Sequence, residues 1–340
     1  METTSHRPHK QPRTLAGEQQ GRQHDLLHFK LQTEIRGDQT EHTYFEPSLV
    51  AHGRLMRRKE VWRRERILGQ GSYGTVYRER LEGGLSRLRA VKQIRKGVVA
   101  SEALEYTREL EAAVIFSRPK YSHCFARSNG WFENDQFVFI AMEYLELGDL
   151  QRYLNRPLPE LETRAITSQV LEGLEYMHEK GFIHRDLKPG NLLVVSLAPN
   201  WHVKIADFGI SKRQFDHGVS NTLEVGTFAF AAPEQLGLGE SAGSYTCSVD
   251  MWSLGAVAYR ILTGTNAFHG LSELVKYIGG KSPFPVGALQ AQHMSVSGLD
   301  FVLRLMSPVP ESRLSAVDAD RHPWLAKPIL SKETPVLLPR

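Results

Sequence analysis

Three short motifs follow one another along the chain and carry side chains that could act on a phosphoryl group. They occupy residues 184–191 (HRDLKPGN), 207–209 (DFG) and 232–234 (APE). Phosphoryl transfer needs little covalent work from a protein, which instead positions the reactants, neutralises charge and accepts the proton of a hydroxyl group. The oxygens of Asn191 and Asp207 are the hard ligands that Mg²⁺ requires. The order of the motifs therefore predicts a phosphoryl-transfer site.

A glycine-rich segment, residues 69–76 (GQGSYGTV), lies upstream of these motifs. Its glycines at 69, 71 and 74 let the backbone lie directly over a polyphosphate, because a Cβ atom there would hold the segment away. A dinucleotide-binding unit has a similar glycine pattern, but it requires a helix immediately after the glycines. The strand-like residues 75–77 follow instead, which favours a phosphate-binding turn between two strands.

The motifs need a scaffold that positions them, and its first half is predicted to consist of short strands and one helix. From Val61 onward, apolar stretches separated by turns predict strands. Residues 102–116 have apolar residues at helical spacing behind Ser101, a possible N-cap, so we expect a helix there. Two more strands are expected at residues 130–133 and 137–142.

The second half of the chain is predicted to be mainly helical. Residues 161–179 place Ile166, Val170, Leu174, Met177 and His178 on one stripe, which is typical of a helix that packs on a core. Helices and loops continue to the end of this half. The pattern therefore predicts a small sheet lobe followed by a larger helical lobe.

The motifs in this register resemble those of eukaryotic-type Ser/Thr protein kinases, with a looser similarity to checkpoint and calmodulin-dependent kinases. The resemblance implies an α+β, bilobal protein kinase fold. Its N-lobe would be a small five-stranded antiparallel sheet with helix C, and its C-lobe would be larger and mainly helical. We expect a flexible, basic and polar extension at residues 1–56, a kinase domain at 57–326 that divides into lobes 57–146 and 147–326, and a tail at 327–340.

The resemblance implies a catalytic group and an activity. Asp186 would orient the substrate hydroxyl and accept its proton, and Lys188 would lie near the oxygens of the transferred phosphoryl group. Thr227 would form hydrogen bonds to Asp186 and Lys188. Asn191 and Asp207 would hold two Mg²⁺ ions. The implied reaction transfers the γ-phosphoryl group of Mg-ATP to Ser/Thr hydroxyls of protein substrates, with ATP and Mg²⁺ as cofactors.

The same resemblance implies a nucleotide site built from the glycine-rich segment, an adenine pocket and the segment that joins the lobes. Met142 would be the gatekeeper, and Glu143 and Leu145 would bond adenine through their backbone. The residues assigned to the site are Leu68, Gly69, Gln70, Gly71, Ser72, Tyr73, Gly74, Val76, Ala90, Lys92, Glu109, Met142, Glu143, Leu145, Asp149 and Leu193.

Lys92 is expected to be buried in a strand, where an ammonium group without an anionic partner is costly. Its natural partners are the α- and β-phosphates of ATP and a glutamate of the next helix. The resemblance favours Glu109 as that glutamate, with Glu111 and Glu105 as alternatives.

Control and specificity are also implied by the resemblance. Arg185 and Lys212 would form a cationic pocket that becomes ordered when a phosphate group neutralises its charge. The expected phosphate acceptors are Thr222 and, as second choice, Ser220. An upstream kinase or the same enzyme in trans would phosphorylate them.

Two residues bear on substrate choice. Gly190 stands where many relatives that require arginine carry glutamate, and Ile210 suggests a preference for Thr over Ser acceptors.

Two buried ion contacts complete the expected structure. Glu234 should pair with Arg313, and Asp250 should hold the catalytic loop from a buried helix, because such pairs fix geometry even where they add little stability.

Two rival interpretations belong to other classes. A pseudokinase scaffold has no physical need for the four groups Lys92, Asp186, Asn191 and Asp207 together. A small-molecule phosphotransferase is disfavoured by the peptide-platform residues, Thr227 and 232–234.

Composition and charge indicate the compartment in which the protein is expected to act. The only cysteines are Cys124 and Cys247, far apart and without a metal-binding pattern, which fits a reducing intracellular compartment, the cytoplasm and/or the nucleus. Neither a signal peptide nor a membrane span is expected.

Residues 1–66 hold 13 Lys and Arg against 9 Asp and Glu, which accounts for the whole net charge of +4. A balanced remainder gives no broad basic face for nucleic acid. The basic segments within 54–64 most simply form a solvated surface, with nuclear import or contact with acidic lipids as the alternatives.

Overall fold

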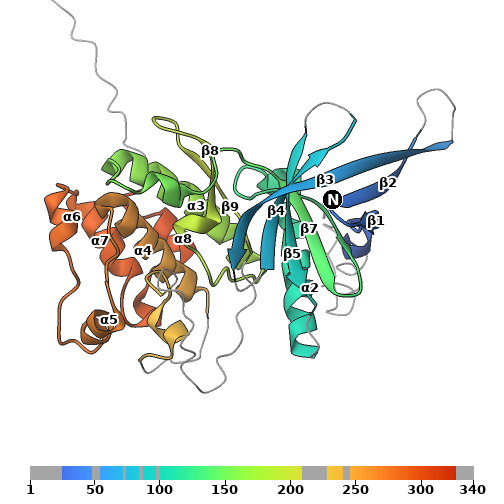
Figure 1. Ribbon diagram of the computed structural model, residues 1–340. Coiled ribbons are helices and arrows are strands. Elements are labelled where there is room, and N and C mark those ends of the chain that lie inside the picture. Colours follow the sequence, from blue (N-terminus) through green and yellow to red (C-terminus); the bar gives the residue numbers. More distant parts are fainter. Residues whose placement is uncertain are drawn as a thin grey trace, which may run out of the picture. The chain divides into compact units, whose positions relative to one another are not determined.

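The computed structural model describes residues 25–47, 54–71, 74–83, 87–96, 100–208, 228–239 and 246–326, with the side chains of the first long helix described from residue 106. The chain divides into two compact units. The first unit comprises residues 1–122 and 126–144, and the second comprises 123–125 and 145–340. Figure 1 labels the elements of each unit.

The first unit is an antiparallel sheet with one long helix. In sheet order β1-β2-β3-β4-β5-β7-β6, the strands are β1 (Gln32–Arg36), β2 (Gln39–Pro47), β3 (Leu55–Gly71), β4 (Gly74–Leu81), β5 (Leu88–Arg95), β7 (Phe137–Glu143) and β6 (Ser128–Glu133). Helix α2 (Ala100–Phe116) follows β5, and the turn at residues 25–28 is helical. The antiparallel sheet and the helix confirm the predicted fold class.

This sheet has seven strands, whereas the sequence analysis expected five. The two additional strands, β1 and β2, lie within residues 1–56, which were expected to be flexible; β2 pairs with β3 from Gln39↔Arg63 to Pro47↔Leu55. The expectation rested on the scarcity of aliphatic residues in this stretch. A strand needs an inward side chain only at every second position, and here Thr40 and His42 are polar residues buried at 3% and 0% exposure.

The core of the first unit is a small cluster on three strands. Val91, Phe132, Phe139 and Ala141 are at most 3% exposed, and the rings of Phe132 and Phe139 stack at a centroid distance of 4.8 Å. Stacked aromatic pairs add packing energy beyond the area they bury. The cluster fixes β5, β6 and β7 against one another.

The second unit is mainly helical, as predicted. Its helices are α3 (Glu160–Glu179), α4 (Ser248–Thr263), α5 (Leu271–Ile278), α6 (Gly287–Ala291), α7 (Val296–Leu305) and α8 (Ala316–Asp320), beside a two-stranded sheet of β8 (Leu192–Ser196) and β9 (His202–Ile205).

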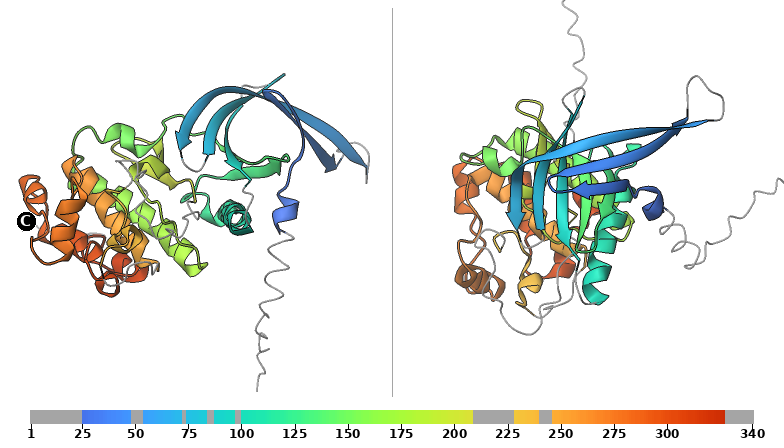
Figure 2. Two further views of the ribbon diagram at one scale, coloured as in Figure 1. Left: turned by 60° about the horizontal axis from the view of Figure 1, so that its bottom comes forward. Right: turned by 45° about the vertical axis from the view of Figure 1, so that its right-hand side comes forward.

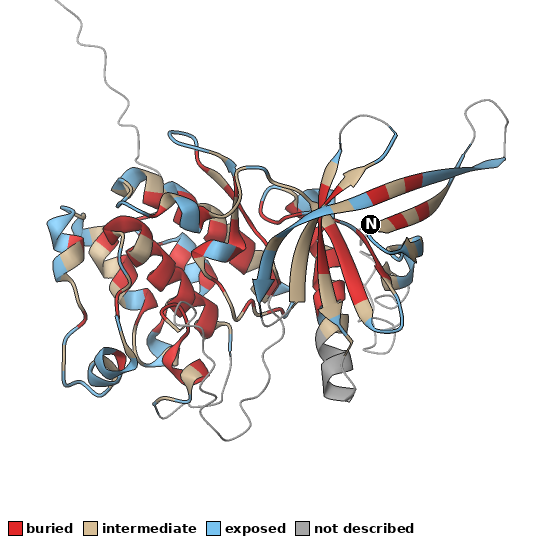
Figure 3. Ribbon diagram, viewed as in Figure 1, coloured by how far each residue is buried: buried red, intermediate tan, exposed pale blue. Residues whose placement is uncertain are grey.

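The centre of this unit is formed by α3 and α4. The stripe predicted on α3 is confirmed at its four apolar members, because Ile166, Val170, Leu174 and Met177 are at most 1% exposed, whereas the fifth member, His178, is only partly buried. Figure 3 shows α4 buried along most of its length, which suits a helix with a continuous apolar sequence. Among the helices of the described ranges, none has the length and apolar character to cross a bilayer.

Candidate functional site

The glycine-rich segment forms the end of β3 and the start of β4. Leu68, Gly69, Gln70 and Gly71 lie on β3, and Gly74 and Val76 lie on β4. A Cβ atom on Gly74 would lie 2.0 Å from the carbonyl oxygen of Gln93, and its φ of +123° is disfavoured for other residues. Only glycine fits at 74. Among the described residues, none has an atom within 4 Å of a Cβ built at Gly69 or Gly71, so packing within the described part of the chain does not require glycine at these two positions.

Lys92 lies on the adjacent strand and is buried, with 4% of its surface exposed. Its Nζ lies 2.5 Å from Oε1 of Glu109 on helix α2. Of the three glutamates considered from the sequence, Glu109 thus makes this contact. Because two buried charges are costly unless they are well paired, the contact fixes where β5 and α2 lie relative to each other.

The expected adenine residues of the first unit are neighbours in the sheet. Ala90 on β5 pairs directly with Met142 at the end of β7, and Val76 pairs with Lys92. Ala90 is 8% exposed. Glu143 is fixed at the strand end, because its carboxylate accepts a hydrogen bond of 2.8 Å from the backbone of Arg127. The register thus places Ala90 beside Met142 and near the strand end at Glu143, and contact of these residues with adenine stays a prediction.

The other three residues assigned to nucleotide binding belong to the second unit. Leu145 is the first residue of the longer segment of this unit, and Asp149 forms a bridge with Leu193 of β8. The carboxylate of Asp149 also accepts a bond of 3.3 Å from Arg152. The structure therefore brings Asp149 and Leu193 together.

Two of the three predicted catalytic residues, Asp186 and Lys188, lie close together on the loop that precedes β8. Nζ of Lys188 lies 3.0 Å from Oδ2 of Asp186. Nδ2 of Asn191 donates to the backbone oxygen of Asp186 at 2.7 Å and to its Oδ2 at 3.2 Å. Because both of these bonds use the side-chain nitrogen of Asn191, its side-chain oxygen is not engaged by them and is suited to coordinate a hard cation.

Asp207 lies next to this loop. The backbone N–H of Ala206 donates to the carbonyl of Asn191 at 2.9 Å, so the two proposed metal ligands are held on adjoining segments. The ring of Phe208 packs against Phe125 with centroids 5.6 Å apart. Asp207 has a φ of 56°, an unusual conformation for a residue other than glycine that is typical of functional sites.

A buried carboxylate holds the catalytic loop, as predicted. Asp250 of α4 is 0% exposed and accepts 2.8 Å hydrogen bonds from the backbone N–H groups of His184 and Arg185. Nε2 of His178 on α3 lies 2.8 Å from the same carboxylate. Arg185 has a φ of 65°, so these bonds hold the loop in a conformation that it would not adopt alone.

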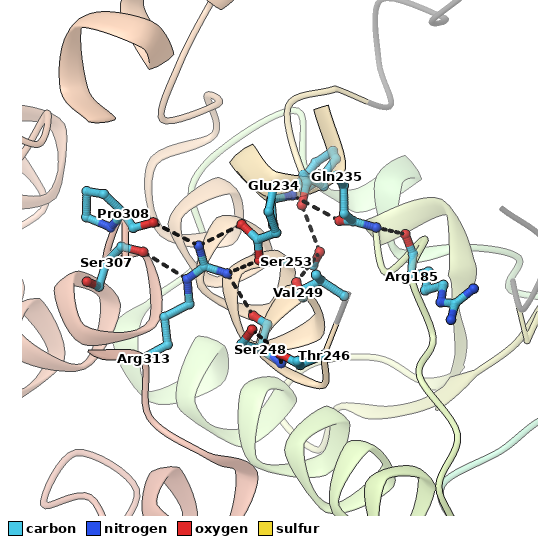
Figure 4. A network of polar contacts seen from close by, with 12 residues as sticks. Arg185, Glu234, Gln235, Thr246, Ser248, Val249, Ser253, Ser307, Pro308 and Arg313 are labelled. Atoms are coloured by element: carbon cyan, nitrogen blue, oxygen red, sulfur yellow. Dashed lines mark hydrogen bonds and ion pairs between the residues drawn. The ribbon is translucent and has the colours of Figure 1, made fainter. Parts of the chain in front are cut away.

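The pairing of Glu234 with Arg313 is also confirmed. The guanidinium makes two contacts with the carboxylate, of 2.6 and 2.9 Å, and donates to the carbonyl of Ser307 at 2.8 Å (Figure 4). The next residue, Gln235, was missed by the sequence analysis. Its Nε2 donates to the backbone oxygen of Arg185 at 2.9 Å and so joins this turn to the catalytic loop. No sequence signal marked it apart from its place after the APE motif.

Several predicted residues lie outside the described ranges, so their placement stays a prediction. They are Ser72, Tyr73, Ser220, Thr222, Thr227, Ile210 and Lys212, and the tail 327–340.

The chain matches the family model described as the protein kinase domain over residues 62–325. It is 33% identical to the serine/threonine-protein kinase cds1 of Schizosaccharomyces pombe, over 76% of this chain and 57% of that protein. It is equally 33% identical to the serine/threonine-protein kinase RAD53 of Saccharomyces cerevisiae, over 77% of this chain and 32% of that protein. The chain thus spans 57% and 32% of the lengths of these two curated relatives.

A further relative is similar over most of its own length. The calcium/calmodulin-dependent protein kinase type 1 of Caenorhabditis elegans is 32% identical over 76% of this chain and 73% of that protein.

Two solved structures share the fold. The crystal structure of Rad53 1-466 in complex with AMP-PNP aligns with a TM-score of 0.63 and 26% identity, over 84% of this chain and 82% of that one. The crystal structure of the Rad53 kinase domain and SCD2 aligns with a TM-score of 0.60 and 31% identity, over 78% and 88%.

Proposed function

Because this chain belongs to the protein kinase family, we propose that it is a serine/threonine kinase that transfers the γ-phosphoryl group of Mg-ATP to hydroxyl groups of proteins. One observation carries the proposal most directly. The carboxylate of Asp186 lies within 3.2 Å of both Lys188 and Asn191, so an acid, an ammonium and an amide converge on one point. A scaffold protein would have no need of this convergence.

Each of these side chains has a role that follows from its chemistry. Asp186 orients the substrate hydroxyl and accepts its proton, for which its carboxylate must stay ionised. Lys188 holds that carboxylate in place by its contact of 3.0 Å and carries positive charge toward the transferring oxygens. Thr227 is proposed to bond the pair and to complete the catalytic group.

The residues present fit Mg-ATP. The open space beside Gly69 and Gly71 suits a backbone cradle for phosphates, whereas Gly74 is required by the close approach of Gln93 on the neighbouring strand. Asn191 and Asp207 supply oxygen ligands for Mg²⁺, and Lys92, held by Glu109, would reach the α- and β-phosphates. When bound, Mg²⁺ neutralises the charge of the phosphates.

The remaining nucleotide contacts are proposed from register and family membership. Leu68, Val76, Ala90 and Leu193 would enclose adenine, with Met142 as gatekeeper. The backbone of Glu143 and Leu145 would form hydrogen bonds to the base, and Asp149 would reach either the ribose hydroxyls or a basic residue of the substrate. Gln70, Ser72 and Tyr73 would complete the cradle. We propose 57–326 as the part of the chain that corresponds to the family's kinase domain.

The test is turnover of Mg-ATP on a degenerate peptide set by wild-type protein and by Asp186→Asn. The amide cannot accept the proton, so we expect phosphate transfer to fall about 10²- to 10⁴-fold. Asp135→Asn, on an exposed turn, is the matched control and should keep the wild-type rate. Equal rates for Asp186→Asn and wild type, or no transfer by the wild type, would sink the proposal.

Regulation and specificity are proposed from the family pattern. Phosphorylation of Thr222, or of Ser220, would activate the enzyme, in trans or through an upstream kinase. Wild-type activity of a phosphate-free Thr222→Ala protein would count against this. Gly190 and Ile210 lead us to expect Thr-directed phosphorylation without a strict demand for upstream arginine, so a Ser-dominated, arginine-dependent peptide profile would refute both.

We place this activity inside the cell, in the cytoplasm and/or nucleus, with protein substrates as partners. Both cysteines carry free thiols, and Cys124 is buried. Burial raises the pKa of the Cys124 thiol to about 12, so it stays protonated and unreactive.

A further inference from the structure

The edge of the sheet of the first unit is covered by the chain that precedes β1. Lys30 forms a parallel bridge with Trp131 of β6, the N–H of Leu31 donates to the carbonyl of Trp131 at 2.7 Å, and the N–H of Trp131 donates to Phe29 at 3.2 Å. The indole N–H of Trp131 also donates to the carbonyl of Leu26 at 2.9 Å. Residues 25–47, named here the N-terminal hairpin, thus contact both ends of the sheet, whose strands curve round in Figure 2.

The hairpin also covers the apolar core of the sheet. Leu31 and Ile35 pack on the cluster that includes Val91 and Phe132. A Cβ on Gly130 would lie 2.8 Å from Cγ of Leu31, so the strand approaches the hairpin as closely as glycine allows. These contacts remove apolar surface of β5 and β6 from water.

A buried cation, Arg89 of β5, depends on the hairpin. Its exposure is 2%, and its side chain donates twice to Glu79, at 2.7 and 3.0 Å. It further donates to Oγ1 of Thr40 at 2.9 Å and to Nε2 of His42 at 2.8 Å. A guanidinium has five N–H donors. Arg89 uses them in four hydrogen bonds, and the hairpin supplies the acceptors of two of these, Thr40 and His42. The group also lies 4.2 Å above the ring of Trp62.

The tautomer of His42 follows from these bonds. Because a guanidinium can only donate, Nε2 of His42 is the acceptor and the ring proton lies on Nδ1, which is 2.7 Å from the hydroxyl of Thr33. The imidazole is therefore neutral and held at both nitrogens. It is a fixed partner for Arg89.

Side chains of a strand alternate between its two faces, and β5 uses both. Arg89 and Val91 face the hairpin and the core, whereas Lys92 faces helix α2, where Glu109 holds it. Any shift of Arg89 along or across the sheet therefore moves Lys92, because Lys92 is only three positions further along the same strand and the hydrogen-bonded strand moves as one piece.

We propose that the N-terminal hairpin is a positioning element of the nucleotide site: through Thr40 and His42 it holds Arg89 on one face of β5, and thereby fixes Lys92 on the other. The inference rests on the proposed binding of Mg-ATP. The family model begins at residue 62, so family membership does not account for this role of residues 25–47. Arg89 acts through Lys92 and is a positioning residue.

The test uses the full chain with Thr40→Val and His42→Phe combined, which removes two acceptors of Arg89 and keeps the shape of both side chains. Affinity for Mg-AMP-PNP is measured first, and the KM values for ATP and for peptide are measured second. Thr40→Ser keeps the hydroxyl and serves as the conservative variant. Arg36→Ala, which alters an exposed side chain of the same hairpin, is the control.

We expect the double variant to bind Mg-AMP-PNP about tenfold more weakly and to raise the KM for ATP to a similar extent, with the KM for peptide unchanged. Thr40→Ser and Arg36→Ala should match the wild type. A purely structural role would instead lower the active fraction, so that kcat falls and both KM values stay the same, and that result would overturn the inference.

Two further outcomes are decisive. If the double variant does not fold, Thr40→Val alone is measured, and an unchanged Kd for Mg-AMP-PNP overturns the inference. If the wild type binds no Mg-AMP-PNP, the proposed function fails and the inference fails with it. Equal Kd values for a wild type that does bind and a folded variant reject the inference alone.

Discussion

At the scale of single residues, the geometry of the catalytic loop depends on a carboxylate that does not touch the reactants. Asp250 accepts hydrogen bonds from two consecutive backbone N–H groups, those of His184 and Arg185. Arg185 needs this support because its positive φ costs free energy. The bonds thereby fix the backbone that leads into the next residue, Asp186, the proposed base.

We therefore expect Asp250→Asn to impair both stability and catalysis. The amide NH₂ would face a backbone N–H, so the free energy of unfolding should fall by about 2–4 kcal/mol and kcat by tenfold or more. Urea denaturation and peptide phosphorylation measure these effects. Asp320→Asn, an exposed residue of α8, should change neither. A stable Asp250→Asn protein with full activity would contradict the role of Asp250.

His42 makes stability depend on pH in a defined direction. Burial, then the charge of Arg89, lowers its pKa from 6.5 to about 3, against the opposite effect of Glu60. Between pH 3 and pH 6.5 the histidine is protonated in the unfolded state but neutral in the folded state, so the unfolded state binds more protons. Neutral His42 therefore makes its full contribution to the free energy of unfolding above pH 6.5, and this contribution decreases as the pH drops toward 3.

The check compares wild type with His42→Phe by chemical denaturation at several pH values. The stability advantage of the wild type should shrink as the pH is lowered from 7 to 4. A difference that stays constant over this range would show that His42 is not the titrating group.

At the scale of elements, the sheet of the first unit depends on a hairpin with an unusual sequence. Residues 32–47 contain few aliphatic side chains, yet β1 and β2 pair along their lengths. Their inward positions are filled by Ile35, Thr40 and His42, and the polar two are satisfied by Arg89. A buried polar group that is fully bonded can replace an apolar one in a sheet.

Close contact between β6 and the hairpin gives an element-scale prediction. Gly130→Ala places a Cβ 2.8 Å from Leu31 at a φ of +117°, so we expect the free energy of unfolding to fall by about 1–3 kcal/mol. Thermal and urea unfolding measure it. Gly287→Ala, at a helical position with no atom within 4 Å, is the control and should be neutral or slightly stabilising. Equal stability of both variants would show that the hairpin does not pack on Gly130.

Most elements that carry the motifs could be predicted from the sequence, because their signals are local. The helix at 102–116, the strands near 130 and 137, and the stripe of α3 follow from periodicity and turns. The hairpin could not be predicted from local signals. Its buried residues Thr40 and His42 are polar, and they can be buried because Arg89, 47 residues or more along the chain, forms hydrogen bonds to them. Gln235 was missed for the same reason.

At the scale of the whole molecule, the proposed function assigns nucleotide contacts to residues of both units. Lys92 belongs to the first unit, and Asp186, Asn191 and Asp207 belong to the second. Family membership confirms the resemblance predicted from the motifs, and the ion pairs within each unit match the prediction. Convergence of the two groups on one nucleotide is the central claim of the proposed function.

A double-mutant cycle for phosphate transfer tests this claim most directly, with Lys92→Met, Asp207→Asn and the double variant compared at saturating peptide. Each single change should lower kcat/KM for ATP by about 10²-fold or more, because each removes charge from the same triphosphate. If the two side chains act on one Mg-ATP, the double variant should be little worse than the poorer single variant. Losses that multiply would show that Lys92 and Asp207 act independently, and would contradict a shared nucleotide.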